Sequence, residues 1–145
     1  MKEILTICAL WGVDVLTKQW AQTRLPLYEK REIVKNHLYF KHIKNDGIAY
    51  NKCSGERKKI LLLTGGILGF YALLLCRWKG RRQTMPLAFL LGGGIGNLCE
   101  RLRRGAVTDF LYVPVKGKRM PVFNLADVFI ALGALGMAFV SWREK

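Results

Sequence analysis

Carboxylates are scarce in this chain of 145 residues, which has 10 Asp and Glu against 24 Lys and Arg and a formal net charge of +14. At the same time, 51% of the residues are hydrophobic. The apolar residues are gathered into runs, and most of the charges lie between the runs. This distribution is typical of a small polytopic membrane protein and argues against a soluble domain.

Residues that form disulfides or bind metals are also few. The four cysteines contain no CxxC pair and three of them lie in apolar runs, so they predict neither a disulfide framework nor a metal site. His37 and His42 share one loop with no further ligand set nearby, and we expect no zinc site there. The basic residues flank apolar runs without any nucleic-acid-binding motif, so lipid head groups explain them better than nucleic acid does.

The apolar runs predict four transmembrane helices in a single integral membrane domain that covers residues 1–145. Their expected positions are about residues 3–20, 60–77, 86–102 and 122–142. The first run lacks a small-x-small cleavage site and contains Asp14 and Lys18, so we expect an uncleaved helix and no signal peptide. Two pairs of glycines spaced by four predict faces for close helix packing. These pairs are Gly65 with Gly69 and Gly92 with Gly96.

The polar loop at residues 21–59 carries the pattern of a small β-structure. Residues 38–43 partly alternate, the turn sequence Asn45-Asp46-Gly47 follows, and residues 48–50 are suited to a second strand. This order predicts a hairpin. Residues 109–113 are also β-prone. The expected fold class is therefore mainly α, with a small β-sheet or hairpin from the first outer loop.

Polar residues cluster at the ends of the apolar runs. Because successive helices alternate in direction, these run ends meet at one face of the membrane. Ionisable residues at membrane depth are costly and usually mark a functional site. The residues expected to converge are Asp14, Lys18, Asn45, Asn97, Arg101, Asp109, Asn124 and Asp127.

Asp109 and Asp127 suggest a specific chemistry. A loop containing Gly117 separates them and can fold back to bring the two carboxylates together. Two carboxyl groups in a poorly hydrated site share a proton, so one serves as general base toward a water and the other as general acid. The alternative is purely structural: Asn124 and Asp127 at a helix N-cap, and Asp109 in a turn.

Five short blocks occur in order along nearly the whole chain. They are Asp14-Val15-Leu16-Thr17-Lys18, Asn45-Asp46-Gly47-Ile48-Ala49-Tyr50, Gly96-Asn97-Leu98-Cys99-Glu100-Arg101, Val107-Thr108-Asp109-Phe110 and Phe123-Asn124-Leu125-Ala126-Asp127. With these blocks in this order, the chain resembles the lipoprotein signal peptidases (signal peptidase II), a family of aspartic proteases. It departs from the family pattern at Glu100, where Asp is usual, and at Ile48 and Tyr50.

The resemblance implies an enzyme of the bacterial cytoplasmic (inner) membrane that needs no cofactor. Asp109 and Asp127 would activate a water, which cuts the signal peptide from diacylglyceryl-modified prolipoproteins just before the lipidated cysteine. The diacylglyceryl chains would stay in the bilayer, and we expect a monomer. The resemblance also implies cytoplasmic termini and an active site near the outer face. A simple count of Lys and Arg on each side favours the opposite orientation.

The same resemblance implies supporting roles for the other polar residues. Asn45, beside Gly47, would clamp the substrate chain. Asn97 and Arg101 would hold the polar framework of the site, and Asp14 with Lys18 would position the first helix. Two further framework positions are Asn124, which would orient a carboxyl group or the substrate backbone, and Ala126.

Two other functions are compatible with these residues. A proton-coupled small-solute transporter also uses membrane carboxylates, but it should carry them near the bilayer midplane. An inactive relative that binds lipidated peptides would keep the same framework without cleavage. The presence of both aspartates argues against the second alternative.

Overall fold

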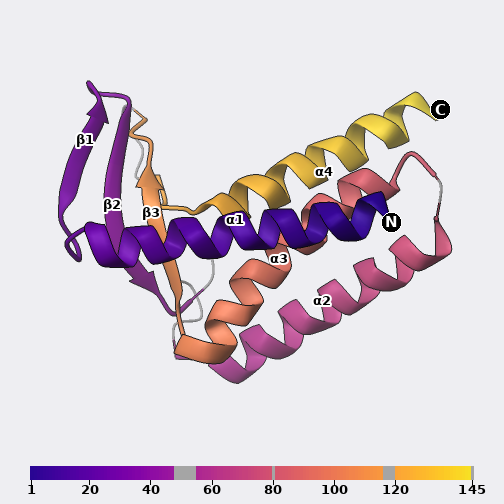
Figure 1. Cartoon of the computed structure of the whole chain (residues 1–145), viewed down its shortest axis with the longest axis horizontal. Coiled ribbons are helices and arrows are strands. Elements are labelled where there is room, and N and C mark those ends of the chain that lie inside the picture. Colours follow the sequence, from indigo (N-terminus) through magenta and orange to yellow (C-terminus); the bar gives the residue numbers. More distant parts are fainter. Residues whose placement is uncertain (48–54, 80, 116–119, 145) are drawn as a thin grey trace.

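The computed structural model describes residues 1–47, 55–79, 81–115 and 120–144. In chain order the elements are α1 (Lys2–Arg24), β1 (Lys30–Val34), β2 (Leu38–Asn45), α2 (Arg57–Arg77), α3 (Thr84–Arg104), β3 (Val107–Tyr112) and α4 (Leu125–Arg143). The sheet lies at one end of the helices and both chain termini lie at the other (Figure 1). The prediction of a mainly helical protein with a small sheet is therefore confirmed.

Each described helix falls on a predicted apolar run, with shifts at the ends. α1 extends to Arg24 and not to residue 20, and α4 begins at Leu125 and not near residue 122. The preceding Phe123 is extended and pairs with Leu111 of β3, and Asn124 caps the helix. The backbone groups that a helix at 122–124 would use are therefore committed to the sheet and the cap.

Two of these helices, α2 and α4, are long and apolar enough to cross a membrane, with mean hydropathies of 2.0 and 1.8 over their most apolar windows. Large apolar side chains on both are exposed, among them Leu63, Leu73, Leu135 and Phe139. Such surfaces are unusual on soluble monomers. α1 and α3 are less apolar because they carry the charged residues of the converging polar cluster.

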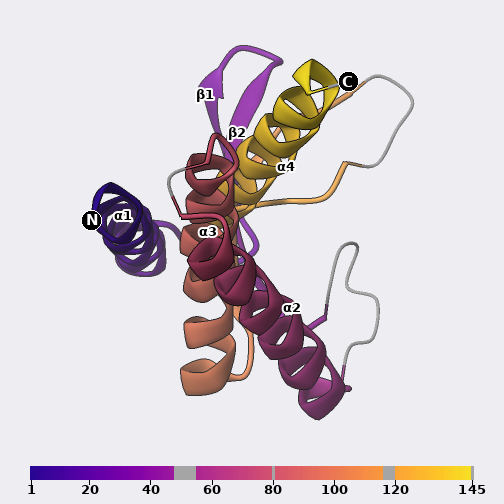
Figure 2. The same cartoon turned by 90° about the vertical axis from the view of Figure 1, so that its right-hand side faces the viewer.

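α3 is the central helix, with α1, α2 and α4 around it (Figure 2). Three successive glycines of α3 each lie against a different helix. A Cβ at Gly92 would meet Leu10 of α1, one at Gly93 would meet the backbone of α4, and one at Gly94 would overlap Leu68 of α2. Close approach of three helices to one turn of α3 therefore depends on the absence of side chains there.

The predicted packing face at Gly65 and Gly69 is wrong for the described part of the chain. A Cβ at either position would meet no atom within 4 Å. α2 instead packs on α3 through Leu68, whose side chain occupies the space left by Gly94. The spacing of small residues marks a face suited to close packing, but it does not supply a partner.

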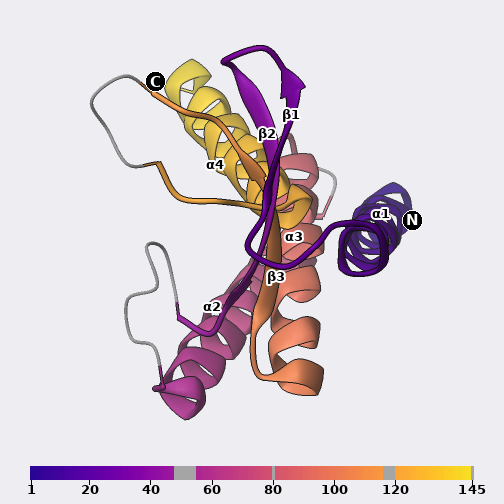
Figure 3. The same ribbon diagram turned by 90° about the vertical axis from the view of Figure 1, so that its left-hand side faces the viewer.

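The sheet is antiparallel, in the order β1-β2-β3, and Figure 3 shows it from its own end of the molecule. The first loop does contribute to a small sheet, but the hairpin in it joins β1 to β2 around residues 35–37 and is not the one predicted around residues 45–47. The predicted second strand at 48–50 lies outside the described residues. In the pairing of β2 with β3, Ile43 faces Asp109 and Asn45 faces Val107.

A small apolar core fastens the sheet to the helices. Ala21 and Leu25 at the end of α1 are buried against Phe110 of β3. The Trp20 ring packs edge-on against Phe40 of β2, with centroids 4.9 Å apart. The end of α1 is therefore packed against two strands, which places β3 beside the polar ends of α1 and α3.

Candidate active site

Asp109 and Asp127 are brought together by the return of the chain from β3 to α4. The backbone N–H groups of Phe110 and Leu111 both donate to the carbonyl of Phe123, at 3.0 and 2.8 Å. The segment that precedes α4 therefore lies against β3, as the expected fold-back requires. Gly117, in the connecting loop, lies outside the described residues.

Asn124 links the two carboxylates. Its side-chain oxygen accepts from the backbone N–H of Asp127 at 3.1 Å, and its backbone N–H donates to Asp127 Oδ2 at 3.2 Å. This is a reciprocal capping box at the start of α4. Because the oxygen is committed to the cap, the amide nitrogen faces the other way and donates to Asp109 Oδ1 at 2.6 Å. Asn124 and Asp127 therefore form the helix N-cap that the structural alternative proposed. The same side chain of Asn124 also binds Asp109, which holds Asp127 beside Asp109.

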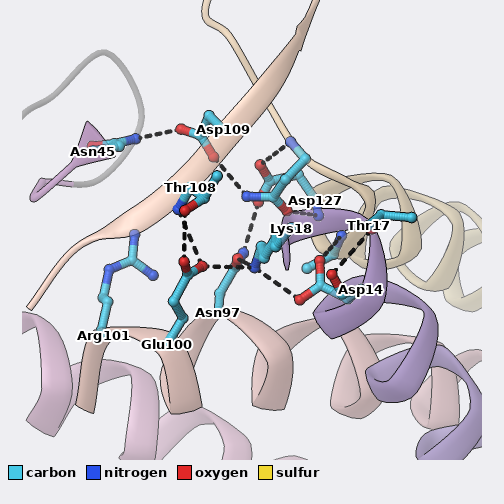
Figure 4. Close-up of polar contacts among 12 residues, drawn as sticks. Asp14, Thr17, Lys18, Asn45, Asn97, Glu100, Arg101, Thr108, Asp109 and Asp127 are labelled. Carbon is cyan, nitrogen blue, oxygen red and sulfur yellow. Dashed lines mark hydrogen bonds and ion pairs between the residues drawn. The ribbon is translucent and has the colours of Figure 1, made fainter. Parts of the chain in front are cut away.

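Asp109 is 2% exposed and accepts from two amides. Asn124 donates to Oδ1, and Asn45 donates to Oδ2 at 2.9 Å (Figure 4). Burial raises the pKa of Asp109 to about 6, with a further contribution from the charge of Asp127, while the two amides act in the opposite direction. A carboxyl group with this pKa is still half protonated near pH 6, where an ordinary aspartate has lost its proton.

Asp127 is held from the side of α3. Asn97 donates its amide N–H to Asp127 Oδ1 at 2.8 Å. The oxygen of the same amide accepts from Lys18 Nζ at 2.8 Å. Lys18 connects further to two carboxylates, Asp14 Oδ2 at 2.8 Å and Glu100 Oε2 at 3.3 Å. A continuous polar chain therefore runs from α1 through α3 to Asp127.

Asp14 joins α1 to α4 at the site. It is fully buried, pairs with Lys18 as the i,i+4 spacing predicts, and accepts from the backbone N–H of Ala126 at 3.1 Å. Gly96 makes room for it, since a Cβ at that position would overlap the Asp14 carboxylate. Ala126 therefore acts through its backbone, directly beside Asp127.

Arg101 and Gly47 contact each other beside Asn45. Arg101 donates to the carbonyl of Gly47 at 2.9 Å, and the N–H of Gly47 donates to Asn45 Oδ1 at 3.1 Å. This second bond fixes the Asn45 amide so that its nitrogen points to Asp109. The predicted turn at residues 45–47 thus orients a side chain of the site.

Three residues at the site were not predicted as members of it. Glu100 accepts from the backbone and the hydroxyl of Thr108, at 3.1 and 2.7 Å, and from Gln22 at 3.0 Å. Gln22 also donates to Thr108 Oγ1 at 2.7 Å. Their signals were present in the sequence: Gln22 lies one turn after Lys18, and Thr108 precedes Asp109. Together they bind the start of β3 to α1 and α3.

A cavity opens between the sheet and the helix ends. Its polar lining comes from Asn45, Asn97, Arg101, Asp109, Asn124 and Asp127, and its apolar lining includes Val107 and Val122. Six of the ten predicted site residues line this cavity. The other four, Asp14, Lys18, Gly47 and Ala126, are connected to them through the contacts described above. Asp109 lies in β3 and Asp127 in the first turn of α4, so neither is at the middle of a helix, which disfavours the transporter alternative.

Comparisons with known proteins agree with this arrangement. The family model of signal peptidase II matches residues 6–143. A lipoprotein signal peptidase of Listeria welshimeri is 30% identical over 139 residues, which cover 94% of this chain and 90% of that protein. One of Xylella fastidiosa is 33% identical, covering 95% of this chain and 86% of the relative. One of Chlorobium phaeobacteroides is 34% identical, covering 84% of this chain and 79% of the relative.

The fold is also shared with solved structures. Two structures of a bacterial membrane enzyme superpose with TM-scores of 0.86 and 0.85, at 23% identity. Each covers 99% of this chain, and this chain covers 88% and 94% of theirs. The family match over residues 6–143 and the relatives at 30% identity or more carry the assignment: the chain belongs to the signal peptidase II family of bacterial membrane proteases.

Proposed function

We propose that this chain is an aspartic endopeptidase with Asp109 and Asp127 as its catalytic pair. It removes the signal peptide from diacylglyceryl-modified prolipoproteins by hydrolysing the bond before the lipidated cysteine. The observation that carries the proposal is the setting of the two carboxylates. They come from different elements, line one cavity, and share Asn124 as a common hydrogen-bonding partner.

The two carboxylates have different surroundings, which supports different roles. Asp109 is buried and its pKa is raised to about 6, so it carries the proton that the pair shares. Asp127 lies at the first turn of α4 and receives N–H groups from Asn97 and Asn124, which hold its two oxygens in place. Asp127 is therefore the general base and Asp109 the general acid.

The reaction follows from these roles. Asp127 takes a proton from a water as the water oxygen bonds to the scissile carbonyl carbon. Asp109 gives its proton to the carbonyl oxygen, which forms a tetrahedral diol. As the C–N bond breaks, the amine of the cysteine takes a proton from Asp127 and the new carboxyl group forms. Return of a proton from the diol to Asp109 restores the starting state.

Other residues would position the substrate. Asn45 at the end of β2 and Arg101 of α3 line the cavity, where an extended peptide would lie. Their own bonds to Asp109 and to Gly47 hold them in place before a peptide arrives. The role of the remaining framework, Asp14, Lys18 and Asn97, is to fix Asp127.

The membrane placement is part of the proposal. All four helices would span the inner membrane, α2 and α4 with apolar surfaces and α1 and α3 with their polar residues turned inward. The exposed apolar side chains of α1, such as Ile4, Leu5 and Leu16, support contact with lipid. The termini would be cytoplasmic, the sheet would lie at the outer face, and the protein would act as a monomer.

The experiment is cleavage of a purified prolipoprotein by the full chain in detergent, with the substrate prepared both with and without its diacylglyceryl group. Mass spectrometry of the products locates the cut. We expect one cut, before the lipidated cysteine, in the modified substrate only.

Two outcomes would contradict the proposal. Equal cleavage of both substrates would show that the enzyme does not require the diacylglyceryl group. Binding of the modified substrate without any cleavage, by a folded protein, would favour the inactive lipopeptide-binding alternative.

A further inference from the structure

A second hollow lies between α1 and α3, outside the catalytic cavity. It consists of two adjoining pockets, which share Gln22, Glu100 and Arg104 as lining residues. We call it the α1–α3 groove. The part along α1 shares no lining residue with the catalytic cavity. The two spaces are separated by the chain of contacts from Lys18 through Asn97 to Asp127.

The groove changes character along its length. Near the middle of α1 its walls include Trp11, Val15, Gly96 and Cys99. Asp14 and Lys18 also line this part, but both are buried and their charges are paired with each other. Eight residues beyond Trp11, at Gln19, the walls become polar, and they stay polar at Gln22. At 1.5 Å per residue the step from Trp11 to Gln19 is about 12 Å of helix. An occupant of the groove therefore has an apolar part and a polar end.

The polar end of the groove is cationic. Arg103 and Arg104 of α3 and Lys44 of β2 line it, and all three side chains are exposed. Within residues 1–47, 55–79, 81–115 and 120–144, no carboxylate forms an ion pair with any of them. Basic residues in the last turn are favourable for α3 itself, because they complement its dipole. That effect does not explain why a lysine from the sheet faces the same space.

Glu100 also lines the groove, but its charge is directed inward. Its two oxygens accept from Thr108 and Gln22, and Oε2 pairs with Lys18. The carboxylate is therefore engaged by donors of the protein, and the groove keeps an excess of positive charge toward an incoming ligand.

We propose that the α1–α3 groove binds an anionic glycerophospholipid, with an acyl chain along Trp11 and Val15 and the phosphate at Arg103, Arg104 and Lys44. Guanidinium groups bind phosphate oxygens with paired N–H donors. Anionic lipids are attracted to basic residues at the membrane surface. A diacylglyceryl group alone carries no charge, so the cationic end distinguishes this lipid from the lipid part of a substrate. The proposal relies on the membrane placement given above and not on the catalytic chemistry.

The test is lipid competition on the full chain in an uncharged detergent. Phosphatidylglycerol and phosphatidylcholine with identical acyl chains are added in equal amounts, and native mass spectrometry counts the lipid retained. We expect one phosphatidylglycerol, retained with a preference on the order of tenfold. Arg103→Gln with Arg104→Gln should abolish the preference. Arg81→Gln with Arg82→Gln, which removes the same charge at the other end of α3, should keep it.

Several results would overturn the proposal. They are equal retention of the two lipids by the unaltered protein, an equal loss of preference in both double variants, and displacement of phosphatidylglycerol by glycerol phosphate alone. Dimers that disappear in the Arg103→Gln, Arg104→Gln variant would identify a second copy of the chain as the occupant. Since the readout is lipid binding, failure of the peptidase assay leaves this test unaffected.

Discussion

Lys18 Nζ donates to the side-chain oxygen of Asn97 at 2.8 Å, deep between α1 and α3. Lysine has no acceptor, so the Asn97 oxygen must face Lys18 and its nitrogen must face Asp127. The same logic applies to Asn124 and Asn45, whose oxygens accept backbone N–H groups while their nitrogens face Asp109. Three amides are thus oriented by their surroundings to offer only N–H groups to the two aspartate carboxylates.

The first prediction concerns the charge of Lys18. Lys18→Met would leave the carboxylates of Asp14 and Glu100 buried without their shared cation. Removing one partner of a buried ion pair costs about 3–5 kcal/mol of stability. Thermal unfolding in detergent should show the loss. Lys59→Met is the matched control, because the Lys59–Glu56 pair is exposed, and it should leave the unfolding temperature unchanged. Equal effects of the two substitutions would contradict the account.

The second prediction compares two glycines. Gly96→Ala places a Cβ onto the Asp14 carboxylate, so it should separate α1 from α3 and abolish cleavage. Gly65→Ala places a Cβ in open space, and alanine is favoured over glycine in a helix by about 1 kcal/mol. It should keep full activity. Cleavage rates and unfolding temperatures of both variants check this, and an active Gly96→Ala enzyme would contradict the close approach of Asp14.

The third prediction is a pH dependence of stability. The pKa of Asp109 is about 6 in the folded protein, against 3.8 for an ordinary aspartate, so between these values the folded state binds more protons than the unfolded state. Stability from this group is therefore present below about pH 4 and is lost as the pH rises through 6. The difference corresponds to a loss on the order of 3 kcal/mol.

The matched variant for this prediction is Asp109→Asn, which cannot titrate. Unfolding measured between pH 4 and pH 7 should show the unaltered protein losing stability relative to the variant. Parallel curves for the two proteins would show that Asp109 has an ordinary pKa.

The fourth prediction separates a positioning role of Asn45 from a structural one. The amide of Asn45 stabilises the charged form of Asp109, so Asn45→Ala should raise the pKa of Asp109 further. If Asp109 is the general acid, the alkaline limb of the pH profile of kcat/KM should move to higher pH. Glu29→Gln, an exposed residue outside the site, should leave the limb in place. If the rate falls but the alkaline limb does not move, Asn45 has no effect on the pKa of Asp109.

Much of this arrangement was predictable from the sequence. The apolar runs predict the four helices, the alternation of helix direction predicts the meeting of their polar ends, and the spacing of Asp14 and Lys18 predicts their ion pair. The β-prone residues 109–113 predict most of β3, which begins two residues earlier at Val107. These features are local or follow from topology, so they can be inferred without knowing side-chain contacts.

Other features depend on long-range contacts that no local pattern encodes. β1 is fully exposed and rich in charge, so it lacks the alternation that reveals a strand, and it is held by pairing with β2. The role of Glu100 depends on the arrival of Thr108 and Gln22 from two other elements. The Gly65 and Gly69 spacing failed as a prediction because α2 lies against α3 through a different face.

The central claim is that Asp109 and Asp127 cut the substrate, and single-turnover cleavage of a diacylglyceryl-modified prolipoprotein tests it most directly. The unaltered protein, Asp109→Asn, Asp127→Asn and the control Glu29→Gln are compared after each is shown to be folded. We predict a loss of rate on the order of 10³-fold in each aspartate variant and none in the control. Cleavage at the normal rate by either folded aspartate variant would contradict the account.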